Sequence, residues 1–191
     1  GRSKLPPFLP FEPGDDFERA LSVYADNIKD MGFNVVRLLV IYEAAEPERG
    51  VYNEEYLKKF DAMVEAFSER GIYIIVDGHQ DLFSRRFHGD GFPDWAISKK
   101  YRDREQTHDR KIWNVGYFTW PVLTSFQRYW DDVDGIRERH VTFYGMLAER
   151  YREQPMVIGF EPINEPMPGW KGLINYSGFH RDMYELYEKV G

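Results

Sequence analysis

The sequence of 191 residues contains no cysteine. This absence excludes disulfides and thiolate metal sites, but it leaves the compartment open because many secreted proteins also lack disulfides. Nor is there an apolar run of the roughly 18 residues that a transmembrane helix needs. The chain begins at Gly1 instead of Met and shows no signal-peptide h-region, so we expect the natural N-terminus to be missing and leave the localisation unknown.

Basic residues are the scarcer charged type, with 25 Lys and Arg against 32 Asp and Glu and a formal net charge of -7. Nucleic-acid affinity rests mainly on clustered Lys and Arg, so nucleic acid is not an expected partner. Aromatic residues, in contrast, make up 17% of the chain, and a hydrophobic fraction of 42% suffices for one globular core. We therefore expect a ligand with little charge and some rings that face it.

Apolar spacing predicts helices that alternate with strands. The helices are expected from Asp15 to Gly32, from Asn53 to Gly71, from Ile136 to Arg152 and from Gly178 to Val190. The strands are expected over residues 33–40, 72–77 and 156–160, as nearly continuous apolar runs of the kind found in parallel sheets covered on both faces. Strand, helix and strand in this order form the unit of a parallel α/β sheet.

The interval between the second and third predicted strands is about twice as long as the one before it, and the excess follows Asp77. We interpret this excess as a βα-loop insertion at about residues 82–133. Such insertions lie at the carboxyl ends of the strands, where α/β folds build their active sites. Its aromatic residues are expected to shape a ligand cleft, and they are Phe83, Phe87, Phe92, Trp95, Tyr101, Trp113, Tyr117, Phe118, Trp120, Phe126, Tyr129 and Trp130.

Polar residues gather where each predicted strand ends, and all should face one rim of the sheet. They are Arg37 on the first strand, Asp77, His79 and Asp81 on the second, and Asn164 and Glu165 on the third. Arg37 lies inside an apolar strand and must be paired, because an isolated buried charge costs several kcal/mol. Its partner is either the carboxylate of a neighbouring strand, in a structural ion pair, or a catalytic carboxylate that it orients.

His79 and Asp81 alternate along the chain, so in extended backbone both side chains point to the same side of the strand end. Three interpretations fit this pattern. The two residues can bind vicinal hydroxyl groups of a sugar, or they can hold a divalent cation together with His88 and Asp90. The third interpretation is a structural histidine whose hydrogen bonds are satisfied within the fold.

The segment Phe160-Glu161-Pro162-Ile163-Asn164-Glu165-Pro166 is the most specific feature of the sequence. It places the Glu165 carboxyl group at a strand end, and Pro166 biases Glu165 toward extended backbone. A general acid for glycosidic cleavage needs such a carboxyl group, held apart from solvent so that its pKa rises toward the working pH. Asn164 could then bind a sugar hydroxyl. The alternative is an ordinary turn rich in Pro and Glu.

Residues 158–166 resemble the Asn-Glu-Pro signature of glycoside hydrolase family 5, the cellulase family. Residues 34–38 and 77–81 are similar to the second and third barrel strands of that family. Within the family, three segments resemble the endoglycoceramidase-like branch, which cleaves glycosidic bonds to lipids: residues 4–8, 79–84 and 89–95. The resemblance implies a (β/α)8 TIM barrel, of which residues 1–191 form a partial catalytic domain with about strands 2 to 4.

The resemblance also implies a retaining mechanism and roles for the residues at the rim. Glu165 would be the acid/base, Asn164 would bind the sugar 2-hydroxyl, and Arg37 would steady the nucleophile. His79 and Asp81 would contact the sugar at the cleavage point. The family uses no metal and no cofactor, so the resemblance disfavours the metal interpretation of this pair.

Lys4 would reach a neighbouring sugar by the same resemblance. The nucleophile is expected beyond Gly191, near the seventh strand, and three strands cannot close a barrel. We therefore expect the remainder of the barrel to come from missing sequence or other segments, and the chain alone to be inactive. The expected substrate is a glycoside, most naturally a glycolipid. The alternatives are an endo-β-glucanase-like polysaccharide hydrolase, a non-catalytic carbohydrate- or glycolipid-binding barrel and a metal-dependent hydrolase.

Overall fold

A computed structural model describes residues 2–10, 16–103 and 110–191. Its centre is a parallel sheet of three strands in chain order, β1 (Val35–Ile41), β2 (Tyr73–His79) and β3 (Val157–Glu161). The register pairs Leu39 with Asp77 and Asp77 with Glu161, so the carboxyl ends of the strands meet at one level. All three predicted strands are confirmed, each beginning and ending one or two residues later than expected.

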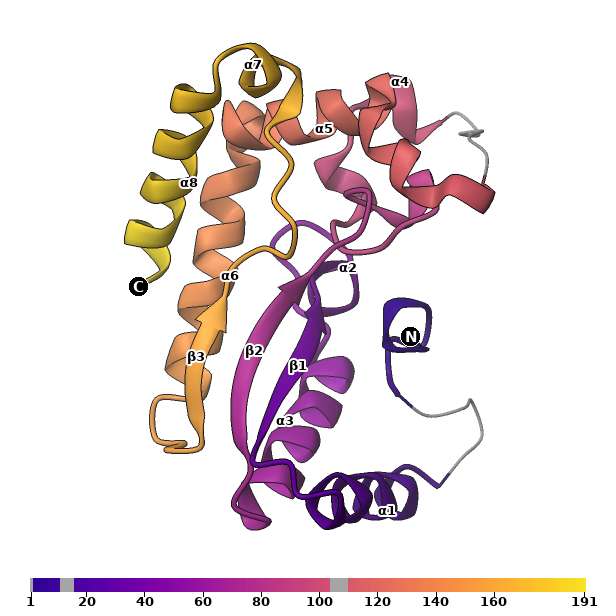
Figure 1. Ribbon diagram of the computed structural model, residues 1–191, viewed down its shortest axis with the longest axis vertical. Helices are drawn as coiled ribbons and strands as arrows, with labels where there is room; N and C mark the ends of the chain where they lie inside the picture. The colour runs from indigo at the N-terminus through magenta and orange to yellow at the C-terminus, as the bar shows by residue number, and fades with distance from the viewer. Residues whose placement is uncertain (1, 11–15, 104–109) are drawn as a thin grey trace.

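The predicted helices are confirmed as α1 (Phe17–Asp30), α3 (Glu54–Glu69), α6 (Ile136–Arg150) and α8 (Tyr176–Val190). Asp15, the expected start of the first helix, lies outside the described residues. In Figure 1, α3 and α6 run alongside the strands, α1 lies below the sheet and α8 lies outside α6. Gly32 and Gly71 follow their helices with φ of +84° and +65°, the left-handed backbone that ends a helix at a glycine.

Helix α3 begins at the predicted cap, because the Asn53 side chain accepts a hydrogen bond from the Tyr56 N–H at 3.2 Å. We expect Asn53→Ala to lower the free energy of unfolding by about 1 kcal/mol, since one N–H of the first turn loses its partner. Urea unfolding followed by circular dichroism measures this. Asn53→Ser should keep most of the stability, and an equal loss in both variants would show that capping is not the cause.

The insertion adds short helices above the sheet. They are α4 (Lys99–Arg102), α5 (Trp120–Trp130) and the 3-10 turns Arg85–Phe87, Asp94–Ala96, Arg110–Phe118 and Val133–Gly135. Three further short helices lie outside it, α2 (Tyr42–Ala45), α7 (Gly169–Ile174) and the 3-10 turn Arg2–Lys4.

Most aromatic residues of the insertion are buried. Those that are buried are Phe83, Phe87, Phe92, Tyr101, Tyr117, Phe126, Tyr129 and Trp130. The rings of Phe83 and Phe92 stack with centroids 4.3 Å apart, and Phe126 packs edge-on against Phe83. The buried rings of the insertion therefore extend the hydrophobic core that the strands and helices form, and Phe92 packs against Tyr42 of α2. Phe118 and Trp120 stay exposed, and the side chain of Trp113 lies outside the described residues.

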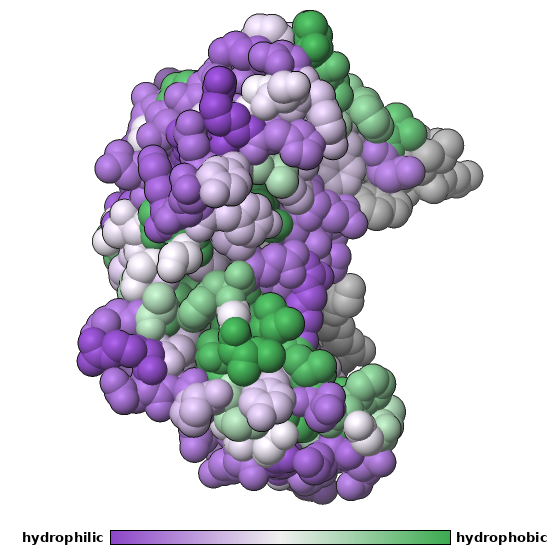
Figure 2. Space-filling model, turned by 60° about the vertical axis from the view of Figure 1, so that its left-hand side comes forward, coloured by the Kyte–Doolittle hydropathy of each residue, from purple (hydrophilic) through white to green (hydrophobic). Residues whose placement is uncertain are grey.

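The strands are less buried than continuous apolar runs predict. Val35 and Arg37, which alternate along β1, are exposed because three strands leave one face of the sheet open, and Ile158 is exposed on the edge strand β3. Figure 2 shows apolar surface gathered on the lower half of the molecule. Within the described ranges, no helix has both the length and the apolar character needed to cross a membrane.

Candidate active site

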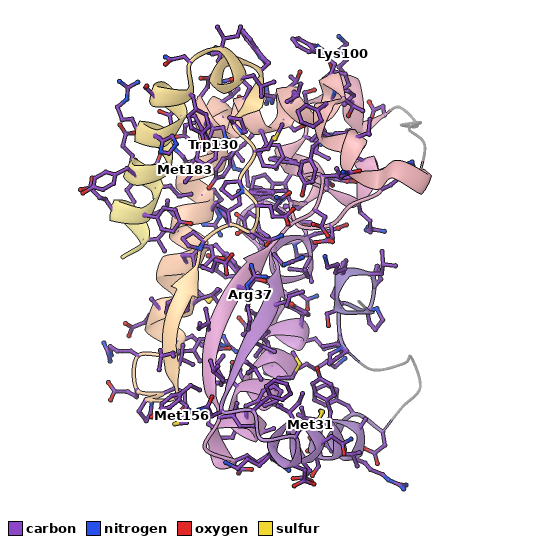
Figure 3. All side chains as sticks on the ribbon, in the orientation of Figure 1. Met31, Arg37, Lys100, Trp130, Met156 and Met183 are labelled. Carbon is purple, nitrogen blue, oxygen red and sulfur yellow. The ribbon has the colours of Figure 1, made fainter. Side chains whose placement is uncertain are left out.

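Arg37 holds the three strands together near their carboxyl ends, where Figure 3 labels it. Its Nε donates to Glu161 Oε2 at 2.7 Å, and its Nη2 lies 3.1 Å from Asp77 Oδ1. The same Nη2 donates to Asn164 Oδ1 at 2.9 Å. The hydrogen bonds to Glu161 raise the pKa of Arg37. The predicted ion pair with neighbouring strands is confirmed, and the orientation of a nucleophile stays a prediction.

His79 connects two carboxylates at the end of β2. Its Nδ1 lies 2.8 Å from Oδ2 of the fully buried Asp77, and its Nε2 lies 3.8 Å from Asp81 Oδ2. Burial opposes the imidazolium form, but the hydrogen bond to Asp77 and the nearby carboxylate of Asp81 outweigh it and raise the pKa of His79 to about 9. The ammonium group of Lys4 also contacts Asp81 Oδ2, so the structure brings Lys4, His79 and Asp81 together as a polar cluster.

Asp90 joins this cluster through the backbone. The Asp81 N–H donates to the Asp90 carbonyl at 3.1 Å, and the Asp90 N–H donates to the Asp81 carbonyl at 2.9 Å. One donor atom each of His79, Asp81 and Asp90 lies within 4.8 Å of the others, whereas His88 is exposed and lies outside the cluster. A cation bound here would have to displace a proton from His79, whereas a hydroxyl group can bind to the cluster without that displacement.

The backbone of Asn164 and Glu165 is fixed by the end of β2. The buried Gln80 amide donates from Nε2 to the carbonyl of Asn164 at 2.6 Å and to that of Glu165 at 3.1 Å. In return, Asn164 Nδ2 donates to the Gln80 carbonyl at 3.0 Å, and the Asn164 N–H donates to the Gly78 carbonyl at 3.0 Å. A side chain at position 78 is excluded, since its Cβ would lie 1.8 Å from Tyr144 Oη.

Glu165 itself departs from two expectations. Its φ is +42°, in the left-handed region and not in the extended region. The cause is that Gln80 Nε2 donates to two successive carbonyls, which turns the chain sharply after β3. The residue is also exposed in this chain instead of being held apart from solvent. Its Oε2 accepts a hydrogen bond from the Tyr117 hydroxyl at 3.3 Å.

A model of the family described as Cellulase (glycosyl hydrolase family 5) matches residues 14–189. The chain belongs to this family. An endoglycoceramidase I of Rhodococcus hoagii (strain 103S) is 37% identical to it over 161 residues, which cover 82% of this chain and 31% of that protein. An endoglycoceramidase of Cyanea nozakii is 32% identical over 185 residues, which cover 87% of this chain and 37% of that protein.

Among solved structures, endo-glycoceramidase II from Rhodococcus sp., in a cellobiose-like imidazole complex, matches this family 5 chain with a TM-score of 0.80. The identity is 25%, and the match covers 98% of this chain and 42% of that one. This likeness confirms the predicted (β/α)8 barrel, of which the chain supplies three parallel strands. The chain spans about a third of the length of the two curated relatives named above.

The sequence predicts the rim residues of this family 5 site, but it does not predict the residues that fix their positions. Gln80 lies between His79 and Asp81 at a strand end, and these polar neighbours are the signal that the sequence offers for it. The proximity of Glu161 to Arg37 depends on sheet register, which the sequence does not show. Nothing in the sequence distinguishes Tyr117 from the other rings of the insertion. The sequence suggests Asp90 only as a metal ligand.

Asp90 should make the free energy of unfolding depend on pH. Burial and the neighbouring Asp81 charge raise its pKa from 3.8 to about 7. A raised pKa contributes stability that is fully present below about pH 4 and is lost as the pH rises to 7. We therefore expect the free energy of unfolding of Asp90→Asn, minus that of the parent, to increase by about 2–4 kcal/mol between pH 4 and pH 7.

Urea unfolding at several pH values tests this in a polypeptide that joins this chain to the remainder of the barrel, here called the barrel-complete protein. Asp94→Asn is the matched control, because its hydrogen bonds to Arg86 lower the pKa of Asp94 below 3.8. Its difference from the parent should stay nearly constant over this range. A constant difference for Asp90→Asn as well would contradict the raised pKa.

Proposed function

We propose that this chain carries the acid/base half of a retaining glycoside hydrolase that cleaves the β-glycosidic bond of a glycolipid. The observation that carries this proposal is the placement of Glu165. Its backbone is clamped by Gln80 at the rim of the barrel, while its carboxyl group remains accessible beside a polar cluster. A general acid has to reach the glycosidic oxygen, and an accessible carboxyl group on a fixed backbone meets that need.

The surrounding side chains offer the hydrogen bonds that a sugar requires. Lys4 and His79 are donors, Asp81 is an acceptor, and all three meet at one point. Burial tends to raise the pKa of Asp81, but the neighbouring His79 and Lys4 outweigh it and keep the pKa low. Asp81 therefore stays ionised and accepts hydrogen bonds from hydroxyl groups. We assign His79 and Asp81 to the sugar at the cleavage point, Asn164 to its 2-hydroxyl and Lys4 to a neighbouring sugar.

A retaining mechanism needs a second carboxylate about 5–5.5 Å from the first. Glu161 does not suit this role, because both of its carboxylate oxygens accept hydrogen bonds from Arg37. We place the nucleophile on the part of the barrel that this chain does not contain. Arg37 would then steady it from a position that Glu161, Asp77 and Asn164 already fix.

The lipid aglycone is supported by the relatives. The two proteins compared above are named endoglycoceramidases, and a 27% identical protein of Rhizopus delemar is named glucosylceramidase. The exposed rings of Phe118 and Trp120 belong to the same insertion as Tyr117, which contacts Glu165. They provide apolar surface on the insertion where a lipid chain can pack.

The test is hydrolysis by the barrel-complete protein of three substrates at matched concentration, a glucosylceramide, a steryl glucoside and a cello-oligosaccharide. We expect a lipid glycoside to be cleaved fastest and proton NMR to show the β-anomer of the sugar as the first product. Faster cleavage of the oligosaccharide would favour a polysaccharide hydrolase. Release of the α-anomer would overturn the retaining mechanism, and binding without turnover would indicate a non-catalytic barrel.

A further inference from the structure

We propose that Tyr117 is a positioning residue that orients the carboxyl group of Glu165 for proton transfer. This inference rests on the proposed acid/base role of Glu165. The phenol comes from the insertion, 48 residues before Glu165 in the sequence, and its hydroxyl donates to Glu165 Oε2 at 3.3 Å. The insertion therefore contacts the reacting group directly.

The surroundings of Tyr117 direct its proton toward Glu165. The ring is 9% exposed and packs near Phe126, with ring centroids 6.5 Å apart. The backbone of Leu82, which follows the cluster residue Asp81, acts on the phenol and opposes the rise in its pKa. The phenol O–H is a donor, and the carboxylate of Glu165 lies within its reach. Burial raises the pKa of the phenol, so it stays a neutral donor at working pH.

The Glu165 side chain needs the hydrogen bond from Tyr117 in addition to the hydrogen bonds that fix its backbone. Gln80 fixes its backbone, but the side chain is exposed and has several rotatable bonds. A hydrogen bond to Oε2 selects the rotamers that keep the carboxyl group near Tyr117 and leaves Oε1 to exchange the proton with the glycosidic oxygen. Small misplacements of a reacting group lower rates strongly, so a hydrogen bond on one oxygen contributes to catalysis without contacting the substrate. The 3.3 Å separation can shorten when a leaving group is bound.

The same hydrogen bond has a predictable electrostatic effect. A donor to a carboxylate stabilises the charged form and lowers the pKa of the acid. Removal of the hydroxyl takes this stabilisation away from the carboxylate. Because the acid must be protonated to act on the leaving group, the basic limb of the pH profile should move to higher pH in Tyr117→Phe.

The experiment measures kcat and KM against pH for Tyr117→Phe in the barrel-complete protein. With a lipid glycoside we expect kcat to fall about tenfold, KM to change little and the basic limb of kcat/KM to shift up by about one pH unit. With a dinitrophenyl glycoside, whose leaving group needs no proton, the first step should keep its rate. Tyr129→Phe is the matched control, because it removes another buried hydroxyl of the insertion, which contacts His140 and not Glu165.

The two proposals fail in different ways. If Tyr117→Phe lowers the rates on both substrates equally, with an unmoved basic limb, Tyr117 is only structural and the inference is wrong. The same conclusion follows if Tyr129→Phe reproduces its behaviour. If Glu165→Gln retains the basic limb of the parent, Glu165 is not the acid and the proposed function itself is wrong.

Discussion

Glu165→Gln is expected to lower kcat/KM of the barrel-complete protein on an unactivated glycolipid by about 10²- to 10⁴-fold. Glutamine keeps the size of the side chain and can still accept from Tyr117, but it has no proton to give to the departing oxygen. The Gln80 hydrogen bonds to the backbone do not depend on the side chain, so the fold should be unaffected. A steady-state assay with a fluorescent glycosylceramide measures the loss.

A substrate whose leaving group needs no proton distinguishes an acid/base role of Glu165 from a purely structural one. A dinitrophenyl glycoside should still form the covalent intermediate in Glu165→Gln, after which hydrolysis stalls because no base activates water. Added azide should then restore turnover, since this small anion attacks without general-base help. Glu153→Gln, a change at an exposed carboxylate before β3, is the control and should behave like the parent. Uniform loss on both substrates without azide rescue would contradict the acid/base role.

The sequence predicted those features that depend on local pattern. Continuous apolar runs located all three strands, and Asn53 with its acidic first turn located the start of α3. The strand ends moved because hydrogen bonding in a parallel sheet follows the register with neighbours, which carries β2 on to His79. The rim residues Arg37, His79, Asp81 and Asn164 came together because parallel strands end at a common level.

The remaining features of the site depend on contacts between distant residues. Pro166 favours extended backbone at Glu165, but the Gln80 amide reaches across from β2 and imposes a left-handed turn. Tyr117 could not be singled out from the other aromatic residues, because composition does not distinguish a ring that fills a core from one that meets a carboxylate. Tertiary contacts therefore set the geometry of Glu165, whereas its location at a strand end follows from sequence.

Arg37→Met should cause the largest loss of stability among the changes considered. Asp77 is fully buried, and its Oδ1 has the Arg37 guanidinium as its ion-pair partner at 3.1 Å. Removal of one member of a fully buried pair costs about 3–5 kcal/mol when the other charge is left unpaired, whereas Asp77 keeps His79 Nδ1 at 2.8 Å from its Oδ2. The Arg37 side chain is 41% exposed, so solvent screening reduces the expected loss to about 2–3 kcal/mol.

Two comparisons identify the cause of this loss in urea unfolding of the barrel-complete protein. Arg70→Met removes a pair with the exposed Asp26 and should cost much less stability than Arg37→Met. Asp77→Asn combined with Arg37→Met removes both charges and should recover part of the stability lost in the single variant. Equal losses for Arg37→Met and Arg70→Met would contradict a buried pair. Because Arg37 also donates to Asn164 Oδ1, the single variant should lose activity even where it remains folded.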